Sequence, residues 1–308
     1  MYAAKKYTKK AIRQDWHRNW ALYLLMIPVL LFYLCFCYKP MYGAIIAFKD
    51  YDPVMGILGS DWVGLKNFTD FFQSSDFVRV FRNTIKISVL NILFGFPAPI
   101  ILALLINELE QKKFAKTVQT ITYMPHFISL VVVCGLIKDF VSDSGVITSI
   151  LGMFGFPQVN MLQEPGMFVP IYIISGIWQE IGWGSIIYLA ALAGVDQQLY
   201  EAASIDGAGR LRQTFSVTLP GIMPTIVTMF ILKLGTIMNV GFEKIILLYD
   251  PITYETADVI SSYVYRKGIV DSDYGFSTAV GLFNSVINFA LIIISNTISR
   301  RVNDTSLW

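Results

Sequence analysis

The stretch FSTAVGLFNSVINFALIIISNTIS, residues 276–299, decides the fold class because its 24 positions contain no charged residue. A helix of that length extends about 36 Å, which exceeds the roughly 30 Å of hydrocarbon in a bilayer. Backbone N–H and C=O groups in lipid need partners within their own segment, and a helix supplies them. Residues 276–299 therefore predict a transmembrane helix.

Further apolar stretches of similar length precede this one. They cover approximately residues 20–38, 84–107, 117–137, 167–192 and 222–248. The first follows a basic start, but its uncharged run is longer than the 7–15 apolar residues typical of a signal peptide, so we interpret it as a retained helix. The alternating pattern of a membrane barrel is absent from the sequence. We therefore predict an all-α integral membrane protein with six transmembrane helices.

The composition agrees with a membrane protein. Only 15% of the 308 residues are charged, whereas soluble domains carry about 25%. The net charge of +2 gives no indication of a nucleic-acid partner. Cys35, Cys37 and Cys134 lie in apolar runs, and His17 and His126 lack ligand spacing. The sequence predicts neither a disulfide nor a metal site.

Lysine and arginine near the span ends predict the orientation. They precede the first span, occupy the connections between spans two and three and between spans four and five, and follow the sixth span. This bias favours both termini in the cytoplasm. We predict a cytoplasmic segment 1–19, a transmembrane permease domain 20–299 with an outer segment 48–82, and a cytoplasmic tail 300–308. A second outer segment, 141–166, contains an apolar piece too short to span, which we expect at the membrane surface or against the bundle.

The connection DQQLYEAASIDGAGRLRQTFSVTLPGIMP, residues 196–224, is cytoplasmic in this topology but has the signals of ordered structure. The Asp196 carboxylate can accept a free backbone N–H and begin a helix. Gly207 can end that helix, since glycine adopts left-handed backbone angles cheaply. A second short helix is predicted over about residues 210–217. We call residues 196–220 the elbow.

Small residues flank one carboxylate on the elbow, that of Glu201. Small side chains let another protein approach closely, and a single charge can orient the contact. The pattern therefore suits a docking site for a soluble subunit, while an ordinary ordered loop is the alternative.

The elbow resembles the EAA motif of ABC importer permeases. The resemblance rests on Glu201-Ala202-Ala203, then Asp206-Gly207-Ala208, and then Leu219-Pro220 with Pro224. The chain is also similar to the polysaccharide and complex-oligosaccharide permeases, a maltose-type class of binding-protein-dependent carbohydrate importers, from about residue 18 to its end. This second similarity rests on residues 38–43, 46–51, 62–68, 123–129 and 239–243.

The resemblance implies an ABC importer type I permease fold in the bacterial cytoplasmic membrane. It also implies that five residues of the elbow contact the ATPase: Glu201, Ala202, Ala203, Asp206 and Gly207. The implied partners are a second homologous permease chain forming a heterodimer, a dimer of ABC ATPase subunits, an extracellular sugar-binding protein or lipoprotein, and an oligosaccharide substrate.

The sequence contains no G-x-x-x-x-G-K-[ST] phosphate-binding loop. Without the N–H cradle and the lysine of that loop, we expect the chain not to bind ATP. We therefore predict a non-catalytic subunit without a cofactor of its own, whose ATP and Mg are bound by the partner ATPase.

Polar and ionisable residues within the spans are candidates for a substrate path, because such residues are costly in lipid. A sugar site needs hydrogen-bonding groups and an aromatic face. The candidates are Trp178, Gln179, Glu180, Asn239 and Glu243, of which the last two would share a helix face at i, i+4 spacing. The alternative is that either glutamate pairs with Lys233 or with the partner permease. His126 is interpreted as a helix-start or packing residue.

Other functions remain open on the sequence. An ABC importer of another solute would have the same elbow. A secondary transporter should show repeated halves or matched broken helices, and a membrane enzyme should show clustered catalytic groups. The sequence shows neither pattern, and dependence of uptake on a separate ATPase would distinguish the importer from both.

Overall fold

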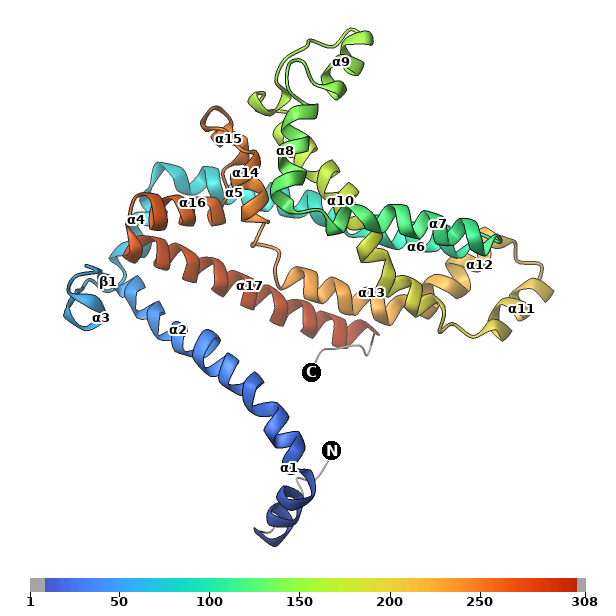
Figure 1. Ribbon diagram of the computed structural model, residues 1–308, viewed down its shortest axis with the longest axis horizontal. Coiled ribbons are helices and arrows are strands. Elements are labelled where there is room, and N and C mark those ends of the chain that lie inside the picture. Colours follow the sequence, from blue (N-terminus) through green and yellow to red (C-terminus); the bar gives the residue numbers. More distant parts are fainter. Residues whose placement is uncertain (1–8, 304–308) are drawn as a thin grey trace.

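The computed structural model describes the backbone of residues 9–303 and the side chains of residues 15–300. It is built almost entirely from helices, which confirms the predicted all-α class. Residues 1–8 of the predicted N-terminal segment 1–19 and residues 304–308 of the predicted tail 300–308 lie outside the described residues. The long helices α6, α7, α10, α13 and α17 form the body of the molecule in Figure 1.

Most of the N-terminal helical stretch extends away from that body (Figure 1), and only its last part, residues 42–48, packs against α17. The stretch comprises α1 (Lys9–Phe32), η1 (Tyr33–Tyr38), α2 (Lys39–Met41) and η2 (Tyr42–Phe48). Their apolar stretch from Asp15 to Phe48 is 34 residues long, and none of its most apolar window is buried within the chain. This stretch contains the predicted first span.

A small compact unit follows. It contains β1 (Lys49–Asp50), α3 (Gly56–Gly59), β2 (Asp61–Trp62) and α4 (Lys66–Gln73). The two strands pair antiparallel with Lys49 opposite Trp62. The Asn67 side chain donates to the carbonyls of Ala47 and Lys49, both at 3.0 Å, and so joins α4 to the start of the unit.

The predicted second span is a helix with a π-helical turn. It runs through α5 (Ser75–Leu90), η3 (Asn91–Gly95) and α6 (Pro97–Asn107). The predicted third span is not straight. Instead, α7 (Lys112–Tyr123) with η4 (Met124–Phe127) meets α8 (Leu130–Phe140) at an angle of 98°. The expectation of one continuous helix over 117–137 is therefore wrong, because Ile128 and Ser129, which follow the proline-containing turn η4, leave the helical conformation.

The apolar piece after α8 forms α9 (Val146–Met153), with η5 (Met161–Gln163) behind it. It lies at the tip of an extension beyond α8 rather than against the body of the molecule (Figure 1). The sequence analysis expected this apolar piece either at the membrane surface or against the helix bundle. Packing against the bundle is not observed in the isolated chain.

The fourth predicted span is α10 (Phe168–Leu192). After the elbow come α13 (Leu219–Leu234) and α14 (Phe242–Leu248). The expectation of one helix over 222–248 is wrong, because residues 235–241 interrupt it. The remaining elements are η7 (Pro251–Thr253), α15 (Tyr254–Ala257), α16 (Ile260–Tyr265), η8 (Arg266–Val270) and α17 (Tyr274–Asn303).

Within the described residues, four helical stretches are long and apolar enough to cross a membrane, and the bent pair α7–α8 raises the number to five. The four are Asp15–Phe48, Ser75–Asn107, Arg210–Leu234 and Tyr274–Arg300. Helix α10 has 25 residues but is not among them, since polar residues such as Gln179 and Glu180 interrupt its apolar sequence.

The α10 helix lies very close to α7. A Cβ atom built on Gly182 of α10 would lie 2.0 Å from the carbonyl oxygen of Thr122. Next to this contact, Ile100, Tyr188 and Ile222 belong to one buried apolar cluster that joins α6, α10 and α13. The close approach therefore fixes α10 within the body of the molecule.

A buried carboxylate joins α5 to the α15–α16 region. The Asp258 side chain is fully buried; its Oδ2 lies 2.6 Å from Nη2 of Arg266 and 3.2 Å from Nη2 of Arg79. Ser262 Oγ donates to Asp258 Oδ1 at 2.8 Å. Burial lowers the pKa of Arg266, but the hydrogen bonds and charge of Asp258 outweigh it, so the net pKa of Arg266 is raised.

Replacing Asp258 by asparagine is expected to destabilise the chain by about 3 kcal/mol, because two partly buried guanidinium groups would lose their shared counter-ion. Asp271→Asn is the matched control, since Asp271 pairs with Lys267 at an exposed position and should cost about 1 kcal/mol or less. Thermal unfolding of the purified variants in detergent measures both. Equal unfolding temperatures for the two variants would contradict this account of Asp258.

Candidate functional site: a cavity and an exposed elbow

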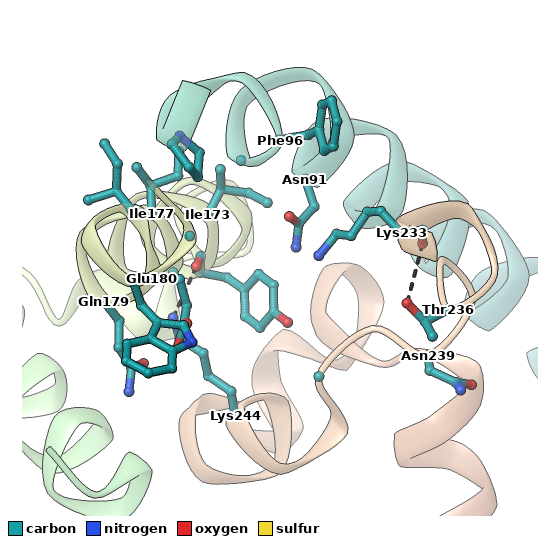
Figure 2. Close-up of a pocket in the computed structure, with 18 of the residues that line it drawn as sticks. Asn91, Phe96, Ile173, Ile177, Gln179, Glu180, Lys233, Thr236, Asn239 and Lys244 are labelled. Atoms are coloured by element: carbon teal, nitrogen blue, oxygen red, sulfur yellow. Dashed lines mark hydrogen bonds between the residues drawn. The ribbon is translucent and has the colours of Figure 1, made fainter. Parts of the chain in front are cut away.

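A cavity of about 760 Å³ opens between α10, η3 and the broken end of α13. Figure 2 shows Asn91 and Phe96 on one side of it, Gln179, Glu180 and Lys244 on another, and Lys233 and Asn239 on the third. A volume of this size is in the range of small-molecule sites in proteins. The cavity therefore has room for part of an oligosaccharide.

The interruption after α13 forms part of the cavity wall and is held by amide side chains of α17. The backbone N–H of Met238 donates to Oδ1 of Asn288 at 3.0 Å. Oδ1 of Asn239 accepts from Nδ2 of Asn284 at 2.8 Å and from Nδ2 of Asn288 at 3.2 Å. Non-helical backbone within a membrane protein is tolerated where side chains satisfy its polar groups or where it lines a cavity, and both conditions hold here.

Four of the five predicted substrate-path residues line this cavity, namely Gln179, Glu180, Asn239 and Glu243. The fifth, Trp178, is not among the lining residues, and Trp183, one helical turn later, is. The expected i, i+4 pairing of Asn239 and Glu243 is wrong, because Asn239 lies in the interruption and Glu243 in α14. The break, rather than a shared helix face, brings them to one cavity.

His126 has a contact that the sequence interpretation missed. Its Nδ1 lies 3.0 Å from Oε2 of Glu180, and its ring stacks on Trp183 with 4.4 Å between centroids. His126 precedes Glu180 by 54 positions, so no local pattern pairs them. The bend between α7 and α8 places His126 beside α10.

Two lysines also belong to the cavity wall, and the sequence interpretation gave Lys244 no role. Lys244 is 7% exposed, and its Nζ donates to the carbonyl of Tyr172 at 3.3 Å. Lys233 is exposed to the cavity. The alternative that Lys233 pairs with Glu180 or Glu243 is not observed, since among the described side chains no such pair lies within 4.0 Å.

The elbow folds locally as the sequence predicts. Helix α11 spans Gln197–Ile205, and Oδ1 of Asp196 accepts from the backbone N–H of Gln198 at 2.9 Å. Gly207 has φ +73° directly after the helix, a conformation that glycine adopts without steric cost. The second helix, α12 (Arg210–Gln213), differs from the expected one, because it continues through the π-helical η6 (Thr214–Thr218) into α13.

Side-chain contacts brace the elbow against its neighbours. Arg210 binds Glu108 at 3.2 Å and Glu110 at 2.7 Å, in the connection between α6 and α7. Within the elbow, the hydroxyl of Tyr200 donates to Oγ1 of Thr218 at 3.1 Å. The elbow is thus tied to two helices that continue into the body of the molecule.

The outer surface of the elbow is exposed and partly apolar. Ile205 is 87% exposed and Leu211 78%, and Glu201 is exposed as well. Among the described residues Glu201 has no ion-pair partner within 4.0 Å. Exposed apolar side chains around an unpaired charge form a surface suited to a protein partner.

Comparison with known protein families shows which family of membrane proteins the chain belongs to. A family model described as "Binding-protein-dependent transport system inner membrane component" matches residues 88–304. That range contains the elbow and the cavity-lining residues. The chain belongs to this family. The resemblance based on the EAA motif is therefore confirmed, and these inner membrane components are multi-pass proteins.

Members of this family similar to the chain include two proteins of Bacillus subtilis (strain 168). Protein LplB is 44% identical over 97% of this chain and 93% of its own length. The polygalacturonan/rhamnogalacturonan transport system permease protein YteP is 43% identical over 93% of this chain and 90% of its own length.

A bacterial alginate ABC transporter gives the structural comparison. One of its chains is 46% identical to this one, with a TM-score of 0.88, over 96% of this chain and 99% of that one. That crystal structure is a complex with the alginate pentasaccharide-bound periplasmic protein. The ABC importer permease fold predicted from the elbow is confirmed by this match.

Proposed function

We propose that this chain is the permease subunit of an ATP-driven importer for oligosaccharides or polysaccharide fragments. The observation that carries the proposal is the elbow, which is an ordered, braced and exposed structure containing the EAA motif. The permeases of polygalacturonan and alginate transport systems support a saccharide cargo. The cavity, whose wall combines apolar and polar side chains, supplies a place for such a cargo to pass.

The proposed topology has six spans with both termini in the cytoplasm, comprising residues 20–299 between the segment 1–19 and the tail 300–308. The four apolar stretches, the bent pair α7–α8 and the more polar α10 provide six candidates. In Figure 1 the elbow lies at the opposite end of the molecule from β1, α3 and α4, as expected if the segment 48–82 faces outward.

The proposed partners follow from that topology. A dimer of ABC ATPase subunits binds ATP and Mg and receives the elbow, so this chain is non-catalytic. A second homologous permease covers the apolar N-terminal helices, and an extracellular sugar-binding protein delivers the oligosaccharide. The small side chains of Ala202, Ala203 and Gly207 let the ATPase surface approach, while Glu201 and Asp206 supply charge for its orientation.

Coupling then works through rigid elements. Movement of the ATPase shifts α11, and the contacts of Arg210 and Tyr200 transmit that shift to the connection between α6 and α7 and to α13. The other end of α13 is the interruption beside Asn239, which lines the cavity. Displacement of the elbow therefore changes the shape of the cavity, which is what alternating access requires.

Co-purification and uptake test the proposed function. The tagged chain, expressed together with the genes that neighbour its own, should purify with a second permease and an ATPase, and cells should accumulate oligosaccharide. Deleting the ATPase should reduce uptake to background. Unchanged uptake without the ATPase, or an active particle that contains this chain alone, would contradict the proposal and favour a secondary transporter.

A further inference from the structure

Two ammonium groups of the cavity wall lack a carboxylate partner. Lys244, on α14, is 7% exposed, and its Nζ lies 3.3 Å from the Tyr172 carbonyl oxygen and 5.2 Å from the centre of the Tyr172 ring. Lys233, in the last turn of α13, extends toward the cavity in Figure 2. Among the described side chains neither lysine has a carboxylate within 4.0 Å.

Among the described side chains, neither carboxylate of the cavity wall, Glu180 or Glu243, lies within ion-pair distance of these lysines. Glu180 already has a partner in His126, whose Nδ1 lies 3.0 Å from Oε2 of Glu180. Glu243 is exposed at the start of α14. Two ammonium groups therefore face a cavity in which one of the two carboxylates is already hydrogen-bonded.

A buried ammonium group without a counter-ion is costly. The lysine ammonium has three N–H donors. In a binding cavity a ligand can supply the missing negative charge and accept hydrogen bonds from the donors that the protein leaves unused. A single long bond to the Tyr172 carbonyl leaves most of this capacity of Lys244 unused. Aromatic rings of Phe96 and Trp183 in the same wall offer faces for the apolar side of sugar rings.

We propose that the cavity accepts oligosaccharides that carry carboxylates, such as uronate-containing chains, and that Lys233 and Lys244 are the residues that bind those carboxylates. The inference rests on the proposed function and narrows its substrate class. Lys233 lies before the interruption after α13 and Lys244 lies after it, and both line the same cavity. The amide of Asn91 and the hydroxyl of Thr236 also line the wall and can form hydrogen bonds with sugar hydroxyls.

The test uses the whole transporter in proteoliposomes, with trigalacturonate and its uncharged trimethyl ester as probes. Wild-type transporter should take up trigalacturonate in preference to the ester. Lys233→Gln and Lys244→Met should each reduce trigalacturonate uptake roughly tenfold, as expected for losing a charge pair, and leave ester uptake unchanged. Lys233→Arg, which keeps the positive charge, should retain most of the trigalacturonate uptake. Lys86→Gln is the negative control and should have no effect, because Lys86 is an exposed lysine outside this cavity.

If Lys244→Met fails to fold, Lys233→Gln still tests the proposal. The Lys233 side chain is exposed to the cavity, so its replacement should leave the fold intact. Equal uptake of both probes by the wild type, or equal losses for both probes in Lys233→Gln, would overturn the charge inference alone. If no saccharide, charged or neutral, enters in an ATP-dependent manner, the proposed function itself fails, and the inference with it.

Discussion

Glu201→Lys is expected to abolish saccharide uptake while the chain remains folded and inserted in the membrane. Glu201 is exposed on α11 and takes part in no ion pair among the described residues, so its replacement removes no contact that the fold needs. At the proposed ATPase interface the new ammonium group would face whatever cationic group the carboxylate contacts. Such a reversal costs about 3 kcal/mol or more, which corresponds to a loss of roughly 100-fold in coupling.

Uptake, ATP hydrolysis and protein level in membranes distinguish uncoupling from misfolding. The matched control is the same substitution at Glu164, an exposed glutamate in the connection between α9 and α10. Glu164→Lys should transport normally, and Glu201→Asp should recover part of the activity. Normal uptake by Glu201→Lys would show that the elbow does not transmit the force of the ATPase.

Gly182→Ala is expected to prevent stable assembly of the chain. The added Cβ would lie 2.0 Å from the carbonyl oxygen of Thr122 and 2.3 Å from its carbon, and backbone atoms cannot rotate away as a side chain can. Helix α10 would have to move relative to α7, which should cost about 3 kcal/mol or more. The protein level in membranes and the unfolding temperature in detergent should both fall strongly.

Gly281→Ala in α17 provides the control for this effect. A Cβ at Gly281 would meet no atom within 4 Å, so the helix should tolerate alanine or gain slightly from its better propensity. If both glycine variants accumulate equally well, the close packing of α10 on α7 does not exist in the membrane-embedded protein.

The elbow was the most predictable part of the molecule because its signals are local. Asp196 caps a helix that begins at the next residue, and Gly207 takes a left-handed conformation directly after the helix ends. Each interaction joins positions within a few residues of each other. Sequence spacing alone is sufficient to predict such features.

The interruptions of the helices were not predictable in the same way. The break after Leu234 contains no proline, and the asparagines that stabilise it, Asn284 and Asn288, come from α17, about 50 positions later. Hydropathy could detect only one long apolar stretch there. The bend at Pro125 had a local signal, but its angle of 98° depends on how α8 packs on α14.

The candidate cavity was predicted in part. Four of the five proposed residues line it, because polar groups in apolar spans tend to face polar surroundings. The contact between His126 and Glu180 and the position of Lys244 depend on those interruptions and had no signal in spacing. Trp178 was the only tryptophan of α10 proposed from the sequence, whereas Trp183 is the one that lines the cavity.

Photo-cross-linking from the elbow tests the central claim most directly. A photoreactive residue in place of Ala203, in cells that contain the whole transporter, should form an adduct with the ATPase subunit. The same residue in place of Met153, which is 83% exposed at the end of α9, should form none. An ATPase adduct from position 153, or its absence from position 203, would contradict the account.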